Sequence, residues 1–276
     1  MDDSDAVAGR LERIVDANRA TIALVFPTVG AGLMLASRRL SHPVLDAAAS
    51  SPVGLVAANA VMALPLAIGV LPVVDRRAAA GLAVVAVLAY VVETVGVATG
   101  FPYGDFAYQT ALGPTAFGVP LALPLFWVPV LVNGLLLALR YVRPRVGSAS
   151  VAAAAAVPIV VGLDAVLDPG AVALGFWAWS DPGAYYGVPW VNFAGWFVSA
   201  TAGIAVLAAS IDVDALARRI DADDPIFDTL VAFLVFWALV NAAYGQLVPL
   251  AGAVGLLALL LATEQDRYLP ADARTR

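Results

Sequence analysis

The sequence has no cysteine, no lysine and a single histidine, and only 13% of its 276 residues carry charge. The absence of cysteine excludes disulfides, thiolate metal sites, iron–sulfur clusters and cysteine nucleophiles. One histidine without cysteine also argues against a zinc site. An average soluble domain has about 25% charged residues, so this composition is poorly suited to a water-soluble fold.

All 15 basic residues are arginines, and 21 acidic residues give a net charge of −6. An acidic, lysine-free chain rich in Ala and Val is typical of proteins adapted to high salt, because acidic surfaces stay hydrated there. The same negative balance disfavours nucleic acid as a partner.

Apolar residues make up 62% of the chain and gather in long runs. A helix needs about 20 apolar residues to cross a hydrocarbon core about 30 Å thick. We therefore predict an all-α integral membrane protein with about eight transmembrane helices, at residues 20–37, 53–74, 78–98, 119–139, 149–168, 190–210, 226–244 and 247–263. One transmembrane domain would then span 20–263, between a polar lead-in at 1–19 without signal-peptide features and a polar tail at 264–276.

The arginines predict the orientation, because short loops rich in Arg stay cytoplasmic. With the N-terminus inside, thirteen arginines lie inside and only Arg38 and Arg39 lie outside. We therefore expect a multi-pass protein of the cell membrane with both termini in the cytoplasm. Two loops without basic residues, at about 99–118 and 169–189, then fall on the outer side.

These two loops are crowded with aromatic residues, Gly and Pro, and they indicate an internal repeat. In each, the sequence GVP opens a predicted helix and a tryptophan follows its glycine by nine residues, at Gly118 to Trp127 and at Gly187 to Trp196. We expect repeat units at about 78–139 and 149–210 that face a shared cavity. A match this short is also compatible with coincidence.

Three acids lie in the predicted helices that adjoin the two aromatic loops. Glu93 is surrounded by apolar residues, where a charge costs about 2.5 to 3.5 kcal/mol, so it is a functional candidate unless it is hydrated near the helix end or bonds to the next helix. Asp164 and Asp168 share one helix face, and one of two such carboxyl groups in a low dielectric keeps its proton, as acid–base chemistry requires. Pro169 is expected to end or kink this helix, and Asp168 could instead be an ordinary turn residue.

The aromatic residues of the two loops lie close to these acids in the sequence. Some of them fit the interfacial belt of membrane proteins, but their concentration in two loops also suits a long conjugated ligand or a carbocation. Asn192 and Asn241 lie in apolar helices, where they either position water or bond between helices.

Two acidic patterns have simpler explanations. Residues 221–224 read DADD, which matches the acid motif of enzymes that protonate alkenes, but they lie in a polar connector and are expected to be solvated. The spacing of Asp164 and Asp168 matches the DxxxD signature of membrane prenyltransferases. Those enzymes need a second aspartate-rich motif and basic residues for diphosphate, which the outer loops lack.

The motifs of both loops follow one another in a fixed order. They run from Glu93 through Gly96, Thr99, Gly100, Pro102, Gly104, Tyr108 and GVP at 118–120, then Asp168-Pro169, Trp177, Trp179, Tyr186, Gly187, Pro189, Asn192, Phe193, Gly195 and Trp196. In this order the motifs resemble the membrane carotenoid hydratase family. The resemblance is close over about 90–200 and extends elsewhere only in hydropathy. The lysine-free composition favours the branch from halophilic archaea.

The resemblance implies addition of water to the terminal isoprenoid double bond of a long acyclic carotenoid, of the bisanhydrobacterioruberin to bacterioruberin type. Such a hydro-lyase needs no cofactor and no metal. The chemistry needs an acid that stays protonated, aromatic faces that stabilise a tertiary cation, and a positioned water. One of Glu93, Asp164 and Asp168 would be the proton donor, another would orient water, and Trp177, Trp179 and Tyr186 would line the cation site.

The expected substrate-binding residues are Tyr103, Asp105, Tyr108, Trp127, Trp177, Trp179, Tyr186, Asn192 and Trp196. The expected partners are a carotenoid held in the bilayer, membrane lipids and other membrane enzymes of the carotenoid pathway. A transporter or proton relay is an alternative, but no polar trail leads inward from the acids. A prenyltransferase of the same pathway and a purely structural membrane protein are further alternatives.

Overall fold

The computed structural model describes residues 3–220 and 225–262. The DADD segment at 221–224 and the predicted tail at 264–276 lie outside the described residues. Within the described part, helices form the bundle and four short strands lie in its loops, which confirms an all-α membrane protein.

Seven segments of the described chain are long and apolar enough to cross a membrane. They are a π-helical turn η1 (Thr21–Val25) with α2 (Phe26–Leu40), α4 (Pro52–Val70) with η2 (Leu71–Val73), α5 (Arg76–Thr99), α6 (Pro124–Tyr141), α8 (Ala149–Ala173), α9 (Trp190–Ser210), and η3 (Pro225–Phe227) with α11 (Asp228–Ala243). The apolar helix α12 (Leu247–Ala262) is shorter. These helices correspond to the eight that the sequence predicts.

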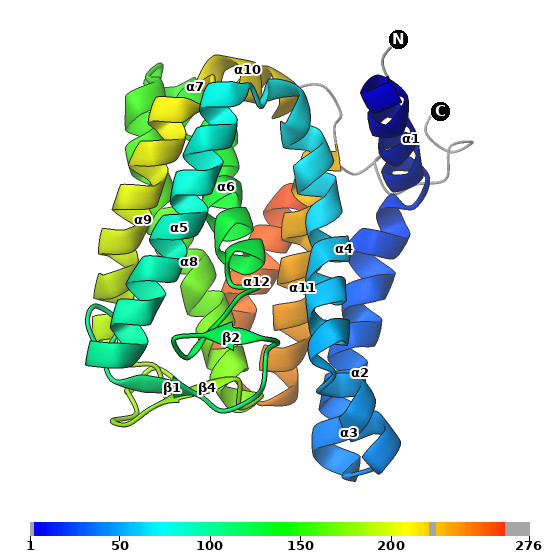
Figure 1. Ribbon diagram of the computed structural model, residues 1–276, viewed down its shortest axis with the longest axis vertical. Coiled ribbons are helices and arrows are strands. Elements are labelled where there is room, and N and C mark those ends of the chain that lie inside the picture. Colours follow the sequence, from blue (N-terminus) through cyan, green and yellow to red (C-terminus); the bar gives the residue numbers. More distant parts are fainter. Residues whose placement is uncertain (1–2, 221–224, 263–276) are drawn as a thin grey trace.

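The long helices run side by side along the longest axis of the molecule (Figure 1). The short helices α1 (Asp3–Ala17), α7 (Arg143–Val146) and α10 (Val213–Ile220) lie at one end. The opposite end, which we call the strand end, carries α3 (Pro43–Ala49) and the loops at 100–123 and 174–189. Helix α1 lies within the polar lead-in predicted at 1–19, so part of that lead-in is helical.

Local signals fix the helix ends. The side chain of Asp75 accepts a hydrogen bond from the backbone N–H of Ala78 at 2.8 Å and so caps the start of α5. Gly100 ends the same helix in the left-handed conformation, with φ of 75°. Ser148 caps α8 in the same way as Asp75 caps α5.

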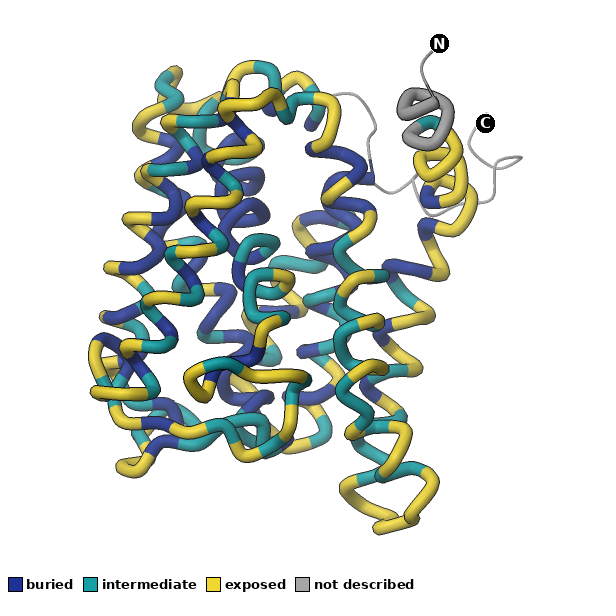
Figure 2. Tube along the Cα trace, in the orientation of Figure 1, coloured by how far each residue is buried: buried dark blue, intermediate teal, exposed yellow. Residues whose placement is uncertain are grey.

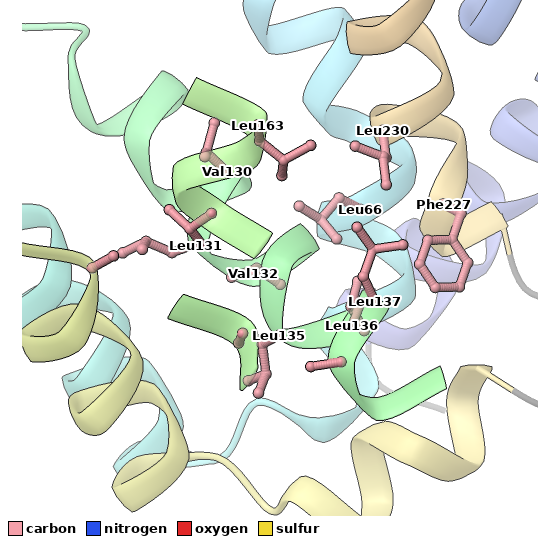
Figure 3. Close-up of a cluster of buried hydrophobic side chains, with 14 of the residues drawn as sticks. Leu66, Val130, Leu131, Val132, Leu135, Leu136, Leu137, Leu163, Phe227 and Leu230 are labelled. Atoms are coloured by element: carbon pink, nitrogen blue, oxygen red, sulfur yellow. The ribbon is translucent and has the colours of Figure 1, made fainter. Parts of the chain in front are cut away.

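The core of the bundle lies around α6, whose leucines pack against α4, α8 and α11 (Figure 3). Figure 2 shows buried residues in the middle of the bundle and exposed residues on its outward faces. Large apolar side chains remain on those faces, including Val87 of α5 at 62% exposure and Val198 of α9 at 60%. A continuous apolar surface of this kind fits a hydrocarbon environment.

The two aromatic loops are joined by backbone pairing. Strand β1 (Phe106–Tyr108) pairs antiparallel with β4 (Trp177–Trp179), so that Phe106 lies opposite Trp179 and Tyr108 opposite Trp177. A second small hairpin pairs β2 (Thr115–Ala116) with β3 (Val119–Pro120). The first GVP thus ends in a strand rather than opening a helix, and α6 begins only at Pro124. The second GVP directly precedes α9, as predicted.

Helix α8 does not end at Asp168 but continues through Pro169 to Ala173, so the predicted end was wrong. Pro169 has no N–H for the carbonyl of Ala165, and the hydroxyl of Tyr185 donates to that carbonyl instead, at 3.1 Å. Two more side chains hold the same turn: Asn241 Nδ2 donates to the carbonyl of Val166 at 2.8 Å, and Gln246 Nε2 donates to that of Pro169 at 3.0 Å. Neighbouring side chains therefore support the helix across its proline.

Candidate active site

A buried pair of carboxyl groups lies near the strand end of α8. Asp164 and Asp168 are 1% and 3% exposed. Asn192, in the first turn of α9, donates from Nδ2 to Asp164 Oδ2 at 3.0 Å and to Asp168 Oδ2 at 2.6 Å. The carboxyl groups also lie within hydrogen-bonding range of each other. One amide thus clamps both acids in a fixed orientation.

The third acid comes from α5. Glu93 is buried, and its Oε1 accepts a hydrogen bond from the hydroxyl of Tyr108 at 2.5 Å. Burial and, to a smaller extent, the nearby Glu93 raise the pKa of Tyr108 above its usual value, so the phenol remains a donor at neutral pH. Tyr108 is itself held opposite Trp177 by the pairing of β1 with β4. The loop pairing therefore orients Glu93.

Glu93 and Asp168 face one cavity. Glu93 lies six residues before the end of α5, about 9 Å along the helix axis, and Asp168 lies five residues before the end of α8, about 8 Å along its axis. The cavity, which we call the main cavity, has an empty volume of about 1660 Å³ including its open side. Its walls come from α2, α4, α5, α6, α8, α9, α11 and both aromatic loops. Asp164 does not line it, which leaves Asp168 as the member of the pair that faces the cavity.

Aromatic rings form the wall around the acids. Trp127 of α6 and Trp196 of α9 stack with ring centroids 5.3 Å apart, and Tyr103 lies 6.1 Å from Trp196. Trp177 packs edge-on against Tyr108 at 6.2 Å and lies within hydrogen-bonding range of Asp168. Aromatic rings therefore lie next to the two carboxyl groups that line the cavity: Tyr108 beside Glu93, and Trp177 beside Asp168. Aromatic rings in such positions can stabilise a cation.

Close packing holds this wall in place. The indole Nε1 of Trp179 donates to the carbonyl of Tyr103 at 2.9 Å, and the hydroxyl of Tyr103 donates to Ser199 Oγ at 3.0 Å. Gly195 allows α9 to approach the first loop, because a Cβ there would lie only 2.6 Å from the carbonyl oxygen of Pro102. These contacts fix the position of the aromatic loops relative to α9.

Most of the expected site residues line the main cavity: Glu93, Tyr103, Tyr108, Trp127, Asp168, Trp177, Trp179, Asn192 and Trp196. Asp105 and Tyr186 do not. Asp105 is exposed, and Tyr186 turns away from the cavity, where its hydroxyl accepts a hydrogen bond from the N–H of Val248 at 3.3 Å. Asn241 bonds to the backbone of α8, which is the structural one of the two roles expected for it.

Three polar residues of the cavity were missed by the sequence reasoning, namely Asn59, Asn133 and Thr229. Each lies in an apolar helix, so the criterion that selected Asn192 could have found them as well. Among the described residues, no group donates to Asn133 Oδ1 and none accepts from Trp127 Nε1. Both atoms are buried polar groups available to a ligand in the cavity. The described residues contain no cluster of three acids, histidines or cysteines suited to a metal ion.

The bundle and its cavity define a multi-pass membrane protein in which buried carboxyl groups and aromatic rings line one cavity. The chain belongs to the family of carotenoid biosynthesis proteins, whose family model matches residues 50–261 of the chain. It is 41% identical over 272 residues to bisanhydrobacterioruberin hydratase from Haloarcula japonica, covering 98% of this chain and 92% of that protein. No solved structure matches the chain. The resemblance found in the motifs is confirmed, and Glu93, Asp164 and Asp168 all lie within the matched residues.

Proposed function

We propose that this protein is a carotenoid hydratase that adds water across the terminal isoprenoid double bond of a long acyclic carotenoid, as in the conversion of bisanhydrobacterioruberin to bacterioruberin. The observation that carries this proposal is the cavity in which Glu93 of α5 and Asp168 of α8 meet aromatic rings. The 41% identity to a bisanhydrobacterioruberin hydratase supports the same substrate class.

In the first step, Asp168 is the proton donor. Two buried carboxyl groups clamped by one amide are most stable when they share one proton. The O–H bond of Asp168 breaks as a C–H bond forms on the less substituted alkene carbon, which leaves a tertiary cation. Trp177, beside Asp168, lies where its ring can stabilise this cation. Asp164 and Asn192 act as positioning residues behind the donor.

In the second step, Glu93 is the base. Tyr108 donates to its Oε1 and holds the carboxylate toward the cavity. As the oxygen of a water molecule bonds to the cation, Glu93 accepts the proton that this water loses. Transfer of that proton back to the Asp164–Asp168 pair restores the site, so each turnover consumes one alkene and one water and yields one tertiary alcohol. These reaction steps need no cofactor.

The predicted repeat units at 78–139 and 149–210 agree with this arrangement. Each unit would supply one carboxyl group to the main cavity, Glu93 or Asp168, and one tryptophan of the stacked pair, Trp127 or Trp196. We further propose that the strand end faces outward and that the protein resides in the cell membrane with cytoplasmic termini. Association with other carotenoid-pathway enzymes stays a prediction.

The function can be tested in cells that accumulate bisanhydrobacterioruberin. Mass spectrometry of the pigment should show a gain of one water per chain end with the native protein. Asp168→Asn and Glu93→Gln should each lower hydration by about a hundredfold or more, the usual effect of removing an acid–base group. Glu12→Gln, an exposed acid of α1, is the matched control and should hydrate normally.

Two outcomes would overturn the proposal. One is unchanged pigment in cells whose membranes contain the full-length native protein. The other is normal hydration by variants in which all three acids, Glu93, Asp164 and Asp168, have been replaced. Retention of carotenoid by the purified variants shows that a loss of activity is not a loss of folding.

A further inference from the structure

A second cavity lies at the strand end, between α2, α3 and the two aromatic loops. We call it the polar cavity, because Ser37, Arg38, Asp46, Gln109 and Thr110 are among its walls. Its empty volume is about 930 Å³ including its open side. Arg38 and Gln109 are exposed, so the cavity is continuous with the surface. Its hydrogen-bonding groups are well suited to hold water.

The polar cavity shares a wall with the main cavity. Met34 of α2 and Phe176, near the start of the second loop, line both. Phe176 directly precedes Trp177, which lies against Asp168 and Tyr108. The side chains of Met34 and Phe176 thus separate a polar space at the surface from the immediate surroundings of the acids.

The backbone of this wall is held firmly. Three successive carbonyls accept hydrogen bonds from the rim of the polar cavity: Leu174 from Arg38 at 2.5 Å, Gly175 from the hydroxyl of Thr110 at 2.7 Å, and Phe176 from the N–H of Gln109 at 2.8 Å. Met34 is only partly buried and has an unbranched, flexible side chain. Met34 is therefore the part of the wall that can move while the loop stays in place.

We propose that the polar cavity is the water inlet of the active site and that water passes between Met34 and Phe176 to reach Glu93 and Asp168. This inference rests on the proposed function, in which each hydrated double bond consumes one water. The other walls of the main cavity are largely apolar side chains, and the outward faces of the bundle suit hydrocarbon, so they offer water few hydrogen-bonding partners. The shared wall joins a polar space at the surface to the cavity that Glu93 and Asp168 line.

The inlet can be tested without measuring catalysis, because the native chain has no cysteine. Leu167→Cys places a single thiol in the main cavity next to Asp168. In nanodiscs, its labelling by a small hydrophilic methanethiosulfonate should become about tenfold faster with Phe176→Ala and about tenfold slower with Met34→Trp, because thiols react as hydrated thiolates. Leu131→Cys, a buried position lining neither cavity, should stay unlabelled in all backgrounds. Equal labelling of Leu167→Cys in all three backgrounds would overturn the inlet.

Turnover provides the second measurement. Met34→Trp should lower hydration by about tenfold while the purified protein retains bound carotenoid. Val29→Trp, at an exposed position of the same helix, should leave hydration unchanged. Normal hydration by Met34→Trp would refute the inlet and leave the proposed function intact. If the native protein does not hydrate carotenoid, the proposed function fails, and the labelling rates still decide whether water reaches the acids through this wall.

Discussion

The hydrogen bond from Tyr108 to Glu93 shows how one loop residue can set the chemistry of a buried acid. The phenol donates at 2.5 Å, and its raised pKa keeps the proton on the tyrosine. Glu93 is thereby presented as an acceptor, whereas Asp164 and Asp168 are clamped together by Asn192. In the proposed mechanism, these different partners suit Glu93 and Asp168 to different tasks.

Tyr108→Phe removes this donor and keeps the ring. Hydrogen bonds to charged groups contribute about 1.5 to 3 kcal/mol, so we expect the turnover number to fall by roughly 10- to 150-fold. Carotenoid retention should not change, because the ring still faces the cavity. Steady-state hydration in membranes measures the effect, with the exposed Tyr244→Phe as control. Turnover equal to that of the native protein would show that Tyr108 does not act through Glu93.

At the scale of elements, α8 holds the acid pair and then continues through Pro169, although a proline inside a helix normally weakens it. Tyr185 supplies the hydrogen bond that the carbonyl of Ala165 cannot obtain from Pro169, and Asn241 and Gln246 hold the next carbonyls. The helical turn between Asp164 and Asp168 is therefore supported from the second loop, from α11 and from the turn that follows α11.

A double-mutant cycle tests the support of α8. Tyr185→Phe leaves the carbonyl of Ala165 unpaired and should lower the free energy of unfolding by about 1 kcal/mol or more. In a Pro169→Ala background the new N–H can reach that carbonyl, so the same change should cost clearly less. Unfolding in mixed micelles gives both values. Tyr186→Phe is the matched control and should cost the same in either background. Equal losses for Tyr185→Phe in both backgrounds would contradict the role of its hydroxyl.

The elements also show which features the sequence could predict. Hydropathy was sufficient to predict the long helices, and the rarity of acids in them made Glu93, Asp164 and Asp168 the candidates. The pairing of β1 with β4 was not predictable, because three-residue strands far apart in the chain carry no local signal. The same holds for Pro169, whose effect depends on a hydroxyl from another loop. The four-residue spacing placed Asp164 and Asp168 on one face, but only packing decides which of them meets the cavity.

At the scale of the whole molecule, the arginines of residues 3–220 divide between the two ends of the bundle. Arg76 and Arg77 open α5 at the end opposite the strand end, the same end at which α7 carries Arg143 and Arg145. The two exceptions, Arg38 and Arg39, donate to the carbonyls of Leu174 and Ala243 at the ends of α8 and α11. Cations are favourable at helix C-termini, so these two have a structural reason to lie at the strand end.

The proposed orientation can be tested with single cysteines in the cysteine-free chain. Ser180→Cys lies in the second loop at the strand end, and Ser150→Cys lies at the start of α8, and both positions are exposed. In intact cells, a membrane-impermeant maleimide should label Ser180→Cys and leave Ser150→Cys unlabelled until the cells are lysed. The reverse pattern would place the strand end in the cytoplasm.

The pairing of β1 with β4 also bears on how a substrate with two reactive ends would be processed. Phe106, Tyr108, Trp177 and Trp179 of the paired strands line the main cavity, and we expect this pairing to prevent a rigid polyene from passing through it. A carotenoid would present one end from the lipid, leave, and return with the other. Hydration would then be distributive, and the singly hydrated pigment would be a free intermediate in the membrane.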